Sequence, residues 1–224
     1  MSTIHDMNAP ELLRFLSELK ANNHRDWFLA NKKWYDTVKK DFEQFVTKVI
    51  LEVGAFDKDI QYLEVKDCTY RINRDVRFSA DKSPYKTQTG AYLAKGGKKS
   101  IYSGYYIHFE PGECFLSGGV YMPLPENLKK IRQGIYDNID EFNEIINNKA
   151  FTKHFKTIEG DKLKSFPKDF PKDEKFEILK YKNFYVMKKE PESLVASDKY
   201  MNEIVETFKA LKPFNDFMNQ IISD

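Results

Sequence analysis

Residues 90–122 read GAYLAKGGKKSIYSGYYIHFEPGECFLSGGVYM, a series of strand-like segments joined by turns. Gly96-Gly97 marks one turn, and Pro111-Gly112 fits the central pair of a type II turn. Strands that follow one another through short turns pair in antiparallel fashion. This stretch therefore predicts that the middle of the chain is an antiparallel sheet built from hairpins.

Helical periodicity precedes the predicted sheet. Apolar residues recur at helical spacing in residues 10–19, with Pro10 in the first turn, and again in residues 34–53, where Gly54 is a natural stop. A further helix is expected to start near Arg25. The N-terminal part of the chain is therefore predicted to be helical.

Helical periodicity returns after the predicted sheet. An apolar stripe covers residues 128–146, a short helix is expected around Phe176 and Leu179, and a last helix should begin at Ser197. Pro213 is expected to kink or interrupt that last helix. Helices, then sheet, then helices, without alternation, predict an α+β fold, with the C-terminal helices packed on the sheet and residues 1–224 in a single domain.

The composition supports an ordinary apolar core. Aromatic residues make up 15% of the 224 residues, with 18 Phe and 13 Tyr, which is enough to fill a core without disulfides or metal. Cys68 and Cys114 are the only cysteines, too few and too far apart for a zinc quartet or a redox CxxC pair. We interpret both as buried thiols, in agreement with a reducing compartment.

The sequence also favours a soluble, cytoplasmic protein. His5, Asp6 and Glu11 lie where a signal peptide would need an apolar stretch. The longest apolar runs, residues 27–30 and 184–187, are far shorter than the roughly 20 residues that a membrane helix requires. We therefore expect neither secretion nor a membrane span.

Charge is unevenly distributed. The formal net charge is only +2, which argues against a protein that coats nucleic acid. Residues 66–99, however, hold nine Lys or Arg against three Asp or Glu, a local charge of +6, so the rest carries −4. This patch indicates either a small anionic ligand or an acidic neighbour that neutralises it.

The most informative window is YRINRDVRFSADKSPYK, residues 70–86, because three of the six arginines in the chain fall within it. Alternation predicts a strand in which Arg71 and Arg77 share a face, with Asp75 between them, while Arg74 interrupts the apolar face. Arginine suits the bidentate binding of carboxylate or phosphate. The candidate ligand-binding residues in this window are Arg71, Arg74, Asp75, Arg77, Asp81, Lys82, Tyr85 and Lys86.

A structural explanation of the same window stays open. Asp75 and Asp81 would then pair with the arginines in a network that holds the loop to the sheet. Outside the window, Arg25 begins a helix next to residues 22–24 and is a possible contributor, although a helix cap followed by core aromatics reads the same way. His108 shares a strand face with Tyr106 and Glu110 and is a candidate base, or simply a hydrogen-bonded histidine.

Familiar cofactor and metal motifs are missing from the sequence. There is no phosphate loop, no GxGxxG, no GxSxG and no HExxH, so we predict neither a cofactor nor a metal site.

Three runs of sequence carry a family resemblance. RINRDVRFSADKSPYK, the earlier LLRFLSELKANNHRDWF and the later GYYIHFEPGECFLSGGVYMP resemble the family catalogued as domain of unknown function 2461, from about Glu11 to Tyr185. The resemblance implies a protein that forms a single unit. It carries over no catalytic residue, substrate or cofactor.

Two functional hypotheses follow. The first is binding of a small phosphate- or carboxylate-bearing ligand at the Arg/Lys-rich segment, with catalysis left open. The second is a non-catalytic interaction module that docks a protein or a nucleic acid, although the net charge of +2 argues against nucleic acid. Its surface would interleave lysines with the tyrosines Tyr85, Tyr92, Tyr102 and Tyr105. The sequence does not predict the oligomeric state.

Overall fold

The computed structural model describes residues 7–223 and has the predicted α+β organisation. The helices before the sheet are α1 (Ala9–Ala21), α2 (Arg25–Ala30), α3 (Lys32–Gly54) and α4 (Val65–Cys68). The strands are β1 (Thr89–Ala94), β2 (Gly104–Phe109), β3 (Phe115–Val120) and β4 (Phe184–Lys189). The later helices are α5 (Pro125–Asp137), α6 (Ile139–Asn147), α7 (Lys149–His154), the 3₁₀ helix η1 (Glu174–Lys180), α8 (Glu192–Val195) and α9 (Tyr200–Ser223).

The four strands form one antiparallel sheet in the order β1-β2-β3-β4. The turn between β2 and β3 is the predicted one: the amide of Glu113 donates to the carbonyl of Glu110 (2.9 Å), and Gly112 has a φ of 81°. β4 was not predicted, because it joins the sheet only after the helices α5 to α7 and η1. Its pairing with β3 places Met187 opposite Ser117.

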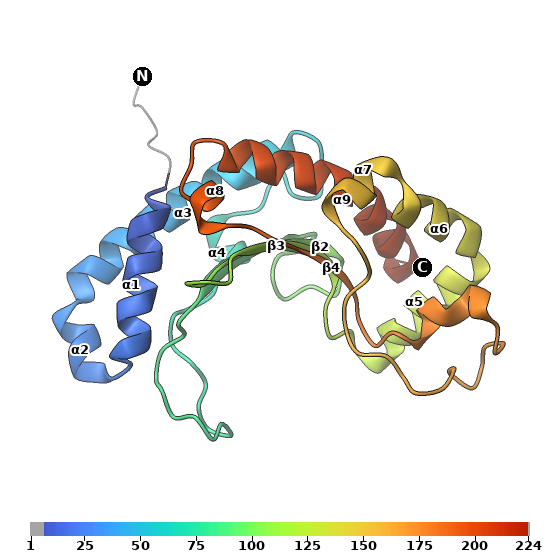
Figure 1. Cartoon of the computed structure of the whole chain (residues 1–224), viewed down its shortest axis with the longest axis horizontal. Helices are drawn as coiled ribbons and strands as arrows, with labels where there is room; N and C mark the ends of the chain where they lie inside the picture. The colour runs from blue at the N-terminus through green and yellow to red at the C-terminus, as the bar shows by residue number, and fades with distance from the viewer. Residues whose placement is uncertain (1–6, 224) are drawn as a thin grey trace.

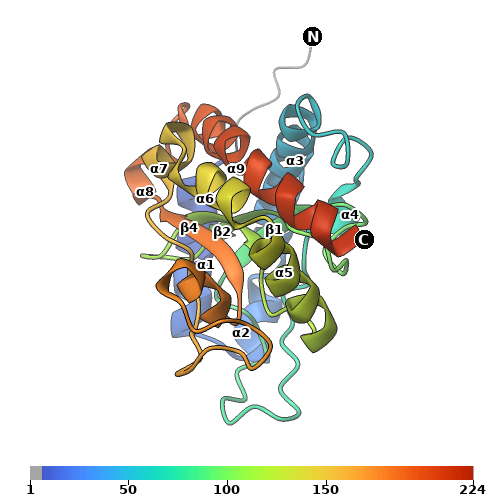
Figure 2. The ribbon, with the colours of Figure 1, turned by 90° about the vertical axis from the view of Figure 1, so that its right-hand side faces the viewer.

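One face of the sheet is covered by the long helices α3 and α9 (Figures 1 and 2). Phe109 of β2 meets Phe42 and Phe45 of α3 edge to face, with ring centroids 5.9 and 5.7 Å apart. Gly118 lets α9 approach β3, because a Cβ there would lie 2.3 Å from a methyl carbon of Leu211. The core of the protein lies on this side.

The opposite face of the sheet has no helix layer (Figure 1). α1 and α2 lie beyond one end of it, and α5 and η1 beyond the other. A long segment also projects from the edge of the sheet, below it in Figures 1 and 2. We call this segment, residues 73–85, the finger.

The predicted strand over residues 68–78 is wrong. This part of the chain makes only isolated bridges, Thr69 with Ala91 and Asn73 with Tyr85. Alternation forms a regular strand where one face is buried. Phe78, on the predicted apolar face, is instead 97% exposed, so burial does not stabilise a strand there.

Two helical expectations also need correction. The stripe over 128–146 belongs to two helices, because Asn138 ends α5 with a bond from its amide to the carbonyl of Gly134 (3.1 Å) and starts α6. Pro213 was expected to kink or interrupt the last helix; α9 bends along its length (Figure 1) but runs on past Pro213 to Ser223, so the interruption is absent. Buried Leu211 and Phe214 on either side of the proline hold both halves of the helix against the core.

Both cysteines are buried free thiols, as expected, and burial raises the pKa of Cys68 to about 12. None of the helices within residues 7–223 is long and apolar enough to cross a membrane. The expectation about a signal peptide depends in part on His5 and Asp6, which lie outside the described residues.

Candidate functional site

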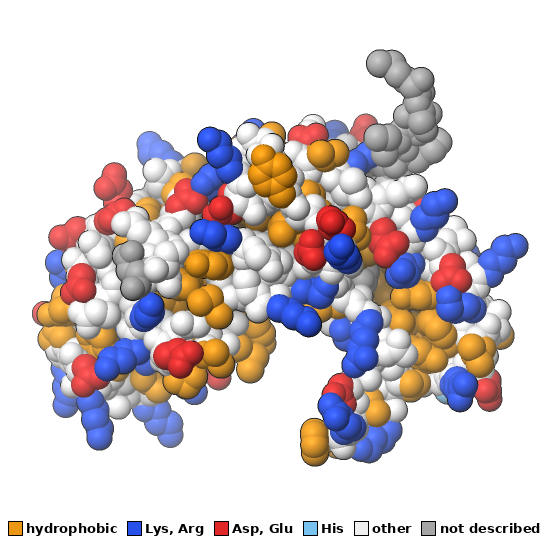
Figure 3. Space-filling model, turned by 180° about the vertical axis from the view of Figure 1, so that it is seen from behind, with side chains coloured by type: hydrophobic (Ala, Val, Ile, Leu, Met, Phe, Trp, Pro, Cys, Tyr) orange, Lys and Arg blue, Asp and Glu red, His pale blue; other side chains and the backbone are white. Residues whose placement is uncertain are grey.

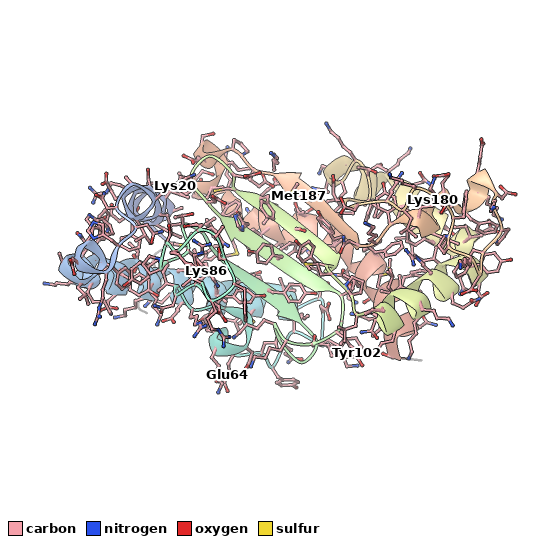
Figure 4. All side chains as sticks on the ribbon, turned by 90° about the horizontal axis from the view of Figure 1, so that it is seen from below. Lys20, Glu64, Lys86, Tyr102, Lys180 and Met187 are labelled. Carbon is pink, nitrogen blue, oxygen red and sulfur yellow. The ribbon has the colours of Figure 1, made fainter. Side chains whose placement is uncertain are left out.

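A cavity of about 680 Å³ lies against the open face of the sheet. All four strands contribute to its floor, α1 and α3 form an apolar wall, and residues 69–72 with Lys86 form another side. Figure 4 looks onto this face from below, with Lys86 at its edge and Met187 on β4. Figure 3 shows the hollow under the sheet from behind, with Lys and Arg side chains beside it and on the finger.

The floor of the cavity is one row of residues across the sheet. The strand register places Tyr92 beside Tyr106, Tyr106 beside Ser117, and Ser117 beside Met187. All four residues line the cavity. A mixed aromatic and thioether floor of this kind suits a flat or apolar ligand body.

Gly90 makes room for the Tyr106 ring. It pairs with His108 in the sheet, and a Cβ at this position would lie 2.6 Å from the Tyr106 hydroxyl oxygen. The Tyr106 side chain therefore crosses β1 at a place where only glycine fits.

A chain of hydrogen bonds runs along β2 at the floor. The Tyr106 hydroxyl lies 3.0 Å from Nδ1 of His108, and Nε2 of His108 lies 3.2 Å from a carboxylate oxygen of Glu110. The Phe115 ring stacks on the imidazole with centroids 4.3 Å apart. Burial lowers the pKa of His108 and raises that of Tyr106, although Glu110 acts in the opposite direction on the histidine.

Besides Lys39, three cationic side chains line the cavity, Arg71, Lys86 and Lys98, and we call their side of the cavity its mouth. The ammonium groups of Lys86 and Lys98 lie 5.4 and 5.9 Å from the centroid of Tyr70. Lys98 also donates to the carbonyl of Lys66. Within residues 7–223, neither the guanidinium of Arg71 nor the ammonium of Lys86 forms a hydrogen bond or an ion pair.

The cations at the mouth are not neutralised by the acid that lines the cavity. Glu43 is paired with Lys39 at 3.0 Å. Burial lowers the pKa of Lys86, and the charge of Arg71 lowers it further. The charge of Arg71 also acts on Asp75, whose pKa is lowered chiefly by hydrogen bonds from Arg77. Since Asp75 pairs with Arg77, the mouth of the cavity keeps an excess of positive charge.

Lys86 is held in place from the turn between α1 and α2. The side chain of Asn23 accepts from the amide of Tyr85 (3.1 Å) and donates to its carbonyl (2.9 Å). The Tyr85 ring stacks on Phe28 with centroids 4.1 Å apart. The next amide, of Lys86, donates to the carbonyl of Ile72 (2.8 Å), so the base of the finger is fixed.

The other candidate residues of the window lie away from the cavity. Arg77 forms a bidentate pair with Asp75, with a shortest contact of 2.6 Å, and both side chains are exposed. Arg74 pairs with Asp81, whose pKa falls to about 2 because of hydrogen bonds from Ser83 and Arg74. Lys82 donates to the carbonyl of Val76 (3.0 Å) and so also serves the loop.

The ten candidates thus separate into two groups. The cavity brings together Arg71, Lys86 and His108. The other seven lie away from it: Arg25 is exposed at the start of α2, Tyr85 is a buried anchor at the base of the finger, and five lie further along the finger, namely Arg74, Asp75, Arg77, Asp81 and Lys82. The clamp with Arg71 and Arg77 side by side does not form, because Arg77 is turned to Asp75.

Sequence reasoning missed most of the cavity floor. Met187 was missed with its strand, whereas Tyr92 and Ser117 lie on strands that were predicted. The sequence feature that could have located the floor is the alternation in β2, which places Tyr106 on one face with His108 and Glu110. In the part of the chain that the structure describes, no three His, Cys, Asp or Glu side chains converge as metal ligands.

The fold and the cavity define a class: an α+β protein whose four-stranded antiparallel sheet carries an aromatic, positively charged cavity on its open face. The sequence pattern of the family described as "Conserved hypothetical protein (DUF2461)" matches residues 11–217. The chain belongs to this family, as its three motifs indicated. The search of curated proteins found no match, and neither did the search of solved structures.

Proposed function

We propose that the protein binds a small organic anion in the cavity on the open face of its sheet. The phosphate or carboxylate of the ligand would contact Arg71 and Lys86, and its body would lie over Tyr106 and Met187. The cavity volume of about 680 Å³ falls in the range of small-molecule sites, roughly 300–1,000 Å³.

One observation carries this proposal: two cations, Arg71 and Lys86, adjoin at the mouth without a carboxylate from residues 7–223 bound to either. Burial is the main cause of the lowered pKa of Lys86, and repulsion from the charge of Arg71 adds to it. An anion between them would relieve that repulsion and accept charge-assisted hydrogen bonds. By contrast, Arg74 and Arg77 already have carboxylate partners.

The interaction-module hypothesis finds less support. Its tyrosines do not form an exposed aromatic face, because Tyr85 and Tyr105 are buried and Tyr92 and Tyr102 are partly buried. The net charge of +2 also gives little general attraction for nucleic acid. A soluble metabolite of the cytoplasm is the ligand class that we favour, and the two buried free thiols fit that compartment.

The experiment is a thermal unfolding screen against nucleotides, sugar phosphates and aromatic carboxylates. It compares the native protein with Arg71→Gln, Lys86→Gln and the matched control Arg77→Gln, which changes an arginine of the finger outside the cavity. A ligand at a hundredfold its Kd should stabilise the native protein by about 2.7 kcal/mol.

We expect one ligand class to raise the melting temperature of the native protein and of Arg77→Gln, but not of Arg71→Gln or Lys86→Gln. An equal response in all four proteins would place the anion elsewhere. If none of the compounds stabilised the native protein, the proposal would lose its basis.

A further inference from the structure

We infer that the cavity is an active site in which Tyr106 is the catalytic acid–base group and His108 its proton acceptor, with Glu110 as the positioning residue. This inference deepens the proposed function, since it assumes that a ligand occupies the same cavity. The substrate class is an organic anion. Next to the Tyr106 hydroxyl, either this anion loses a proton or a water molecule loses one as it attacks the anion.

The geometry comes from the period of the strand. Tyr106, His108 and Glu110 are alternate residues of one extended segment, so their side chains follow one another on the same face. At neutral pH the lowered pKa of His108 leaves the imidazole neutral. The carboxylate of Glu110, which only accepts, assigns the ring proton to Nε2. Nδ1 is then the acceptor for the Tyr106 hydroxyl.

A comparison with Tyr92 separates this arrangement from ordinary burial of a tyrosine. Tyr92 pairs with Tyr106 across the strands and lines the same cavity. Its hydroxyl donates to the backbone carbonyl of Tyr102 (2.8 Å), with a second carbonyl, of Gly119, at 3.2 Å. A carbonyl of this kind does not take up a proton, whereas an imidazole does. Of these two tyrosines, Tyr106 is therefore the one whose hydroxyl is hydrogen-bonded to a base.

The proposed step moves two protons. A bond between hydrogen and a substrate or water atom breaks while an O–H bond forms at Tyr106, and the original Tyr106 proton passes to Nδ1 of His108. The resulting imidazolium is stabilised by the carboxylate of Glu110, and the negative charge left on the substrate lies near the cations Arg71 and Lys86. The raised pKa of Tyr106 favours this coupled transfer over a free phenolate.

The test uses a covalent probe, 4-(fluorosulfonyl)benzoate, whose carboxylate can bind at the cationic mouth. The Tyr106 oxygen forms a bond to sulfur, the S–F bond breaks, fluoride leaves to solvent, and the phenolic proton goes to His108. Labelling rates at Tyr106, Tyr92 and Tyr62 are followed by peptide mass mapping. Tyr62, which is 85% exposed, reports the intrinsic reactivity of the probe in every variant.

We expect Tyr106 to react at least about tenfold faster than Tyr92 and Tyr62. His108→Gln should remove that advantage. Glu110→Gln, on the solvent side of the relay, should lower the maximal labelling rate severalfold and leave the half-saturating probe concentration unchanged. Tyr62 should label at the same rate throughout. If Glu110 had only a structural role, a Glu110→Gln protein with an unaltered melting temperature would keep the maximal labelling rate of the native protein.

The two proposals fail in different ways. Arg71→Gln should raise the half-saturating probe concentration but not the maximal labelling rate. If labelling of the native protein does not saturate with probe concentration but still depends on His108, the anion site is rejected and the relay is kept. Saturable labelling in which Tyr106 reacts no faster than Tyr92, or in which His108→Gln and Glu110→Gln change nothing, would overturn the relay and keep the anion site.

Discussion

The two faces of the sheet differ although the same strands build both. On the covered face, β2 contributes Tyr105, Ile107 and Phe109, all buried under α3 and α9. On the open face, the intervening residues are Tyr106 and His108, whose polar atoms bond to one another and line a cavity. Alternate residues of one strand therefore serve different ends: one set stabilises the core, and the other lines the cavity.

The largest effect should come from a pair of phenylalanines on opposite faces. Phe109→Ala empties a fully buried position between Phe42 and Phe45 and should cost about 3–5 kcal/mol of unfolding free energy. Phe115→Ala, on the open face of the adjacent strand, removes a half-buried ring and should cost roughly 1 kcal/mol. Urea unfolding measures both, and equal losses would contradict the distinction between the faces.

Asn23→Ala should have an intermediate effect. It deletes both hydrogen bonds to the backbone of Tyr85 and leaves that amide and carbonyl without their partner, at a cost of about 1–3 kcal/mol. The base of the finger should then move, so anions that stabilise the native protein should bind Asn23→Ala more weakly. Denaturant unfolding and ligand titration test the two parts separately; unchanged anion affinity would show that Asn23 does not position Lys86.

A smaller effect should appear with pH. The folded-state pKa of His108 lies below its ordinary value because burial outweighs the attraction of Glu110 and Glu113. The neutral ring therefore contributes stability that is present above about pH 6.5 and is lost as the pH falls through the lower folded pKa. The native protein should lose more unfolding free energy than His108→Gln between pH 7 and pH 5. Parallel pH profiles would mean that the ring is solvated.

The smallest effect should be that of Arg77→Gln. Both partners of its ion pair with Asp75 are exposed at the finger, where solvent screens the interaction. We expect no measurable change in the unfolding midpoint and none in anion binding. A loss of binding with unchanged stability would bring the finger into the site.

The sequence predicted most of the secondary structure, but not every strand pairing. The strand-like segments and turns of residues 90–122 predicted the hairpins of the sheet correctly, because Gly96-Gly97 and Pro111-Gly112 mark turns in the local sequence. β4 was not predicted because nothing in the local sequence indicates that it pairs with β3, from which residues 121–183 separate it. The charged window misled for a related reason: its alternation has no core to bury against, since Phe78 is exposed.

The candidate site was predictable only in part. Arginine enrichment located the segment, and Arg71 does reach the cavity, but nothing in the sequence separates it from Arg77, which pairs with Asp75 two residues before it. That separation depends on where the finger leaves the sheet, which Asn23 fixes from a distant turn. The alternation predicted that Tyr106, His108 and Glu110 share a strand face, but their hydrogen bonds to one another and their place at a cavity required the whole fold.

Methionine methyl NMR tests the central claim most directly, because Met187 lies on the cavity floor and Met218 is buried in α9 on the covered side. Nucleotides, sugar phosphates and aromatic carboxylates are titrated into protein labelled at its methionine methyl groups. We predict that a stabilising anion shifts the Met187 signal, leaves the Met218 signal in place, and has no such effect in Arg71→Gln. A ligand that stabilises the protein without moving the Met187 signal would contradict the account.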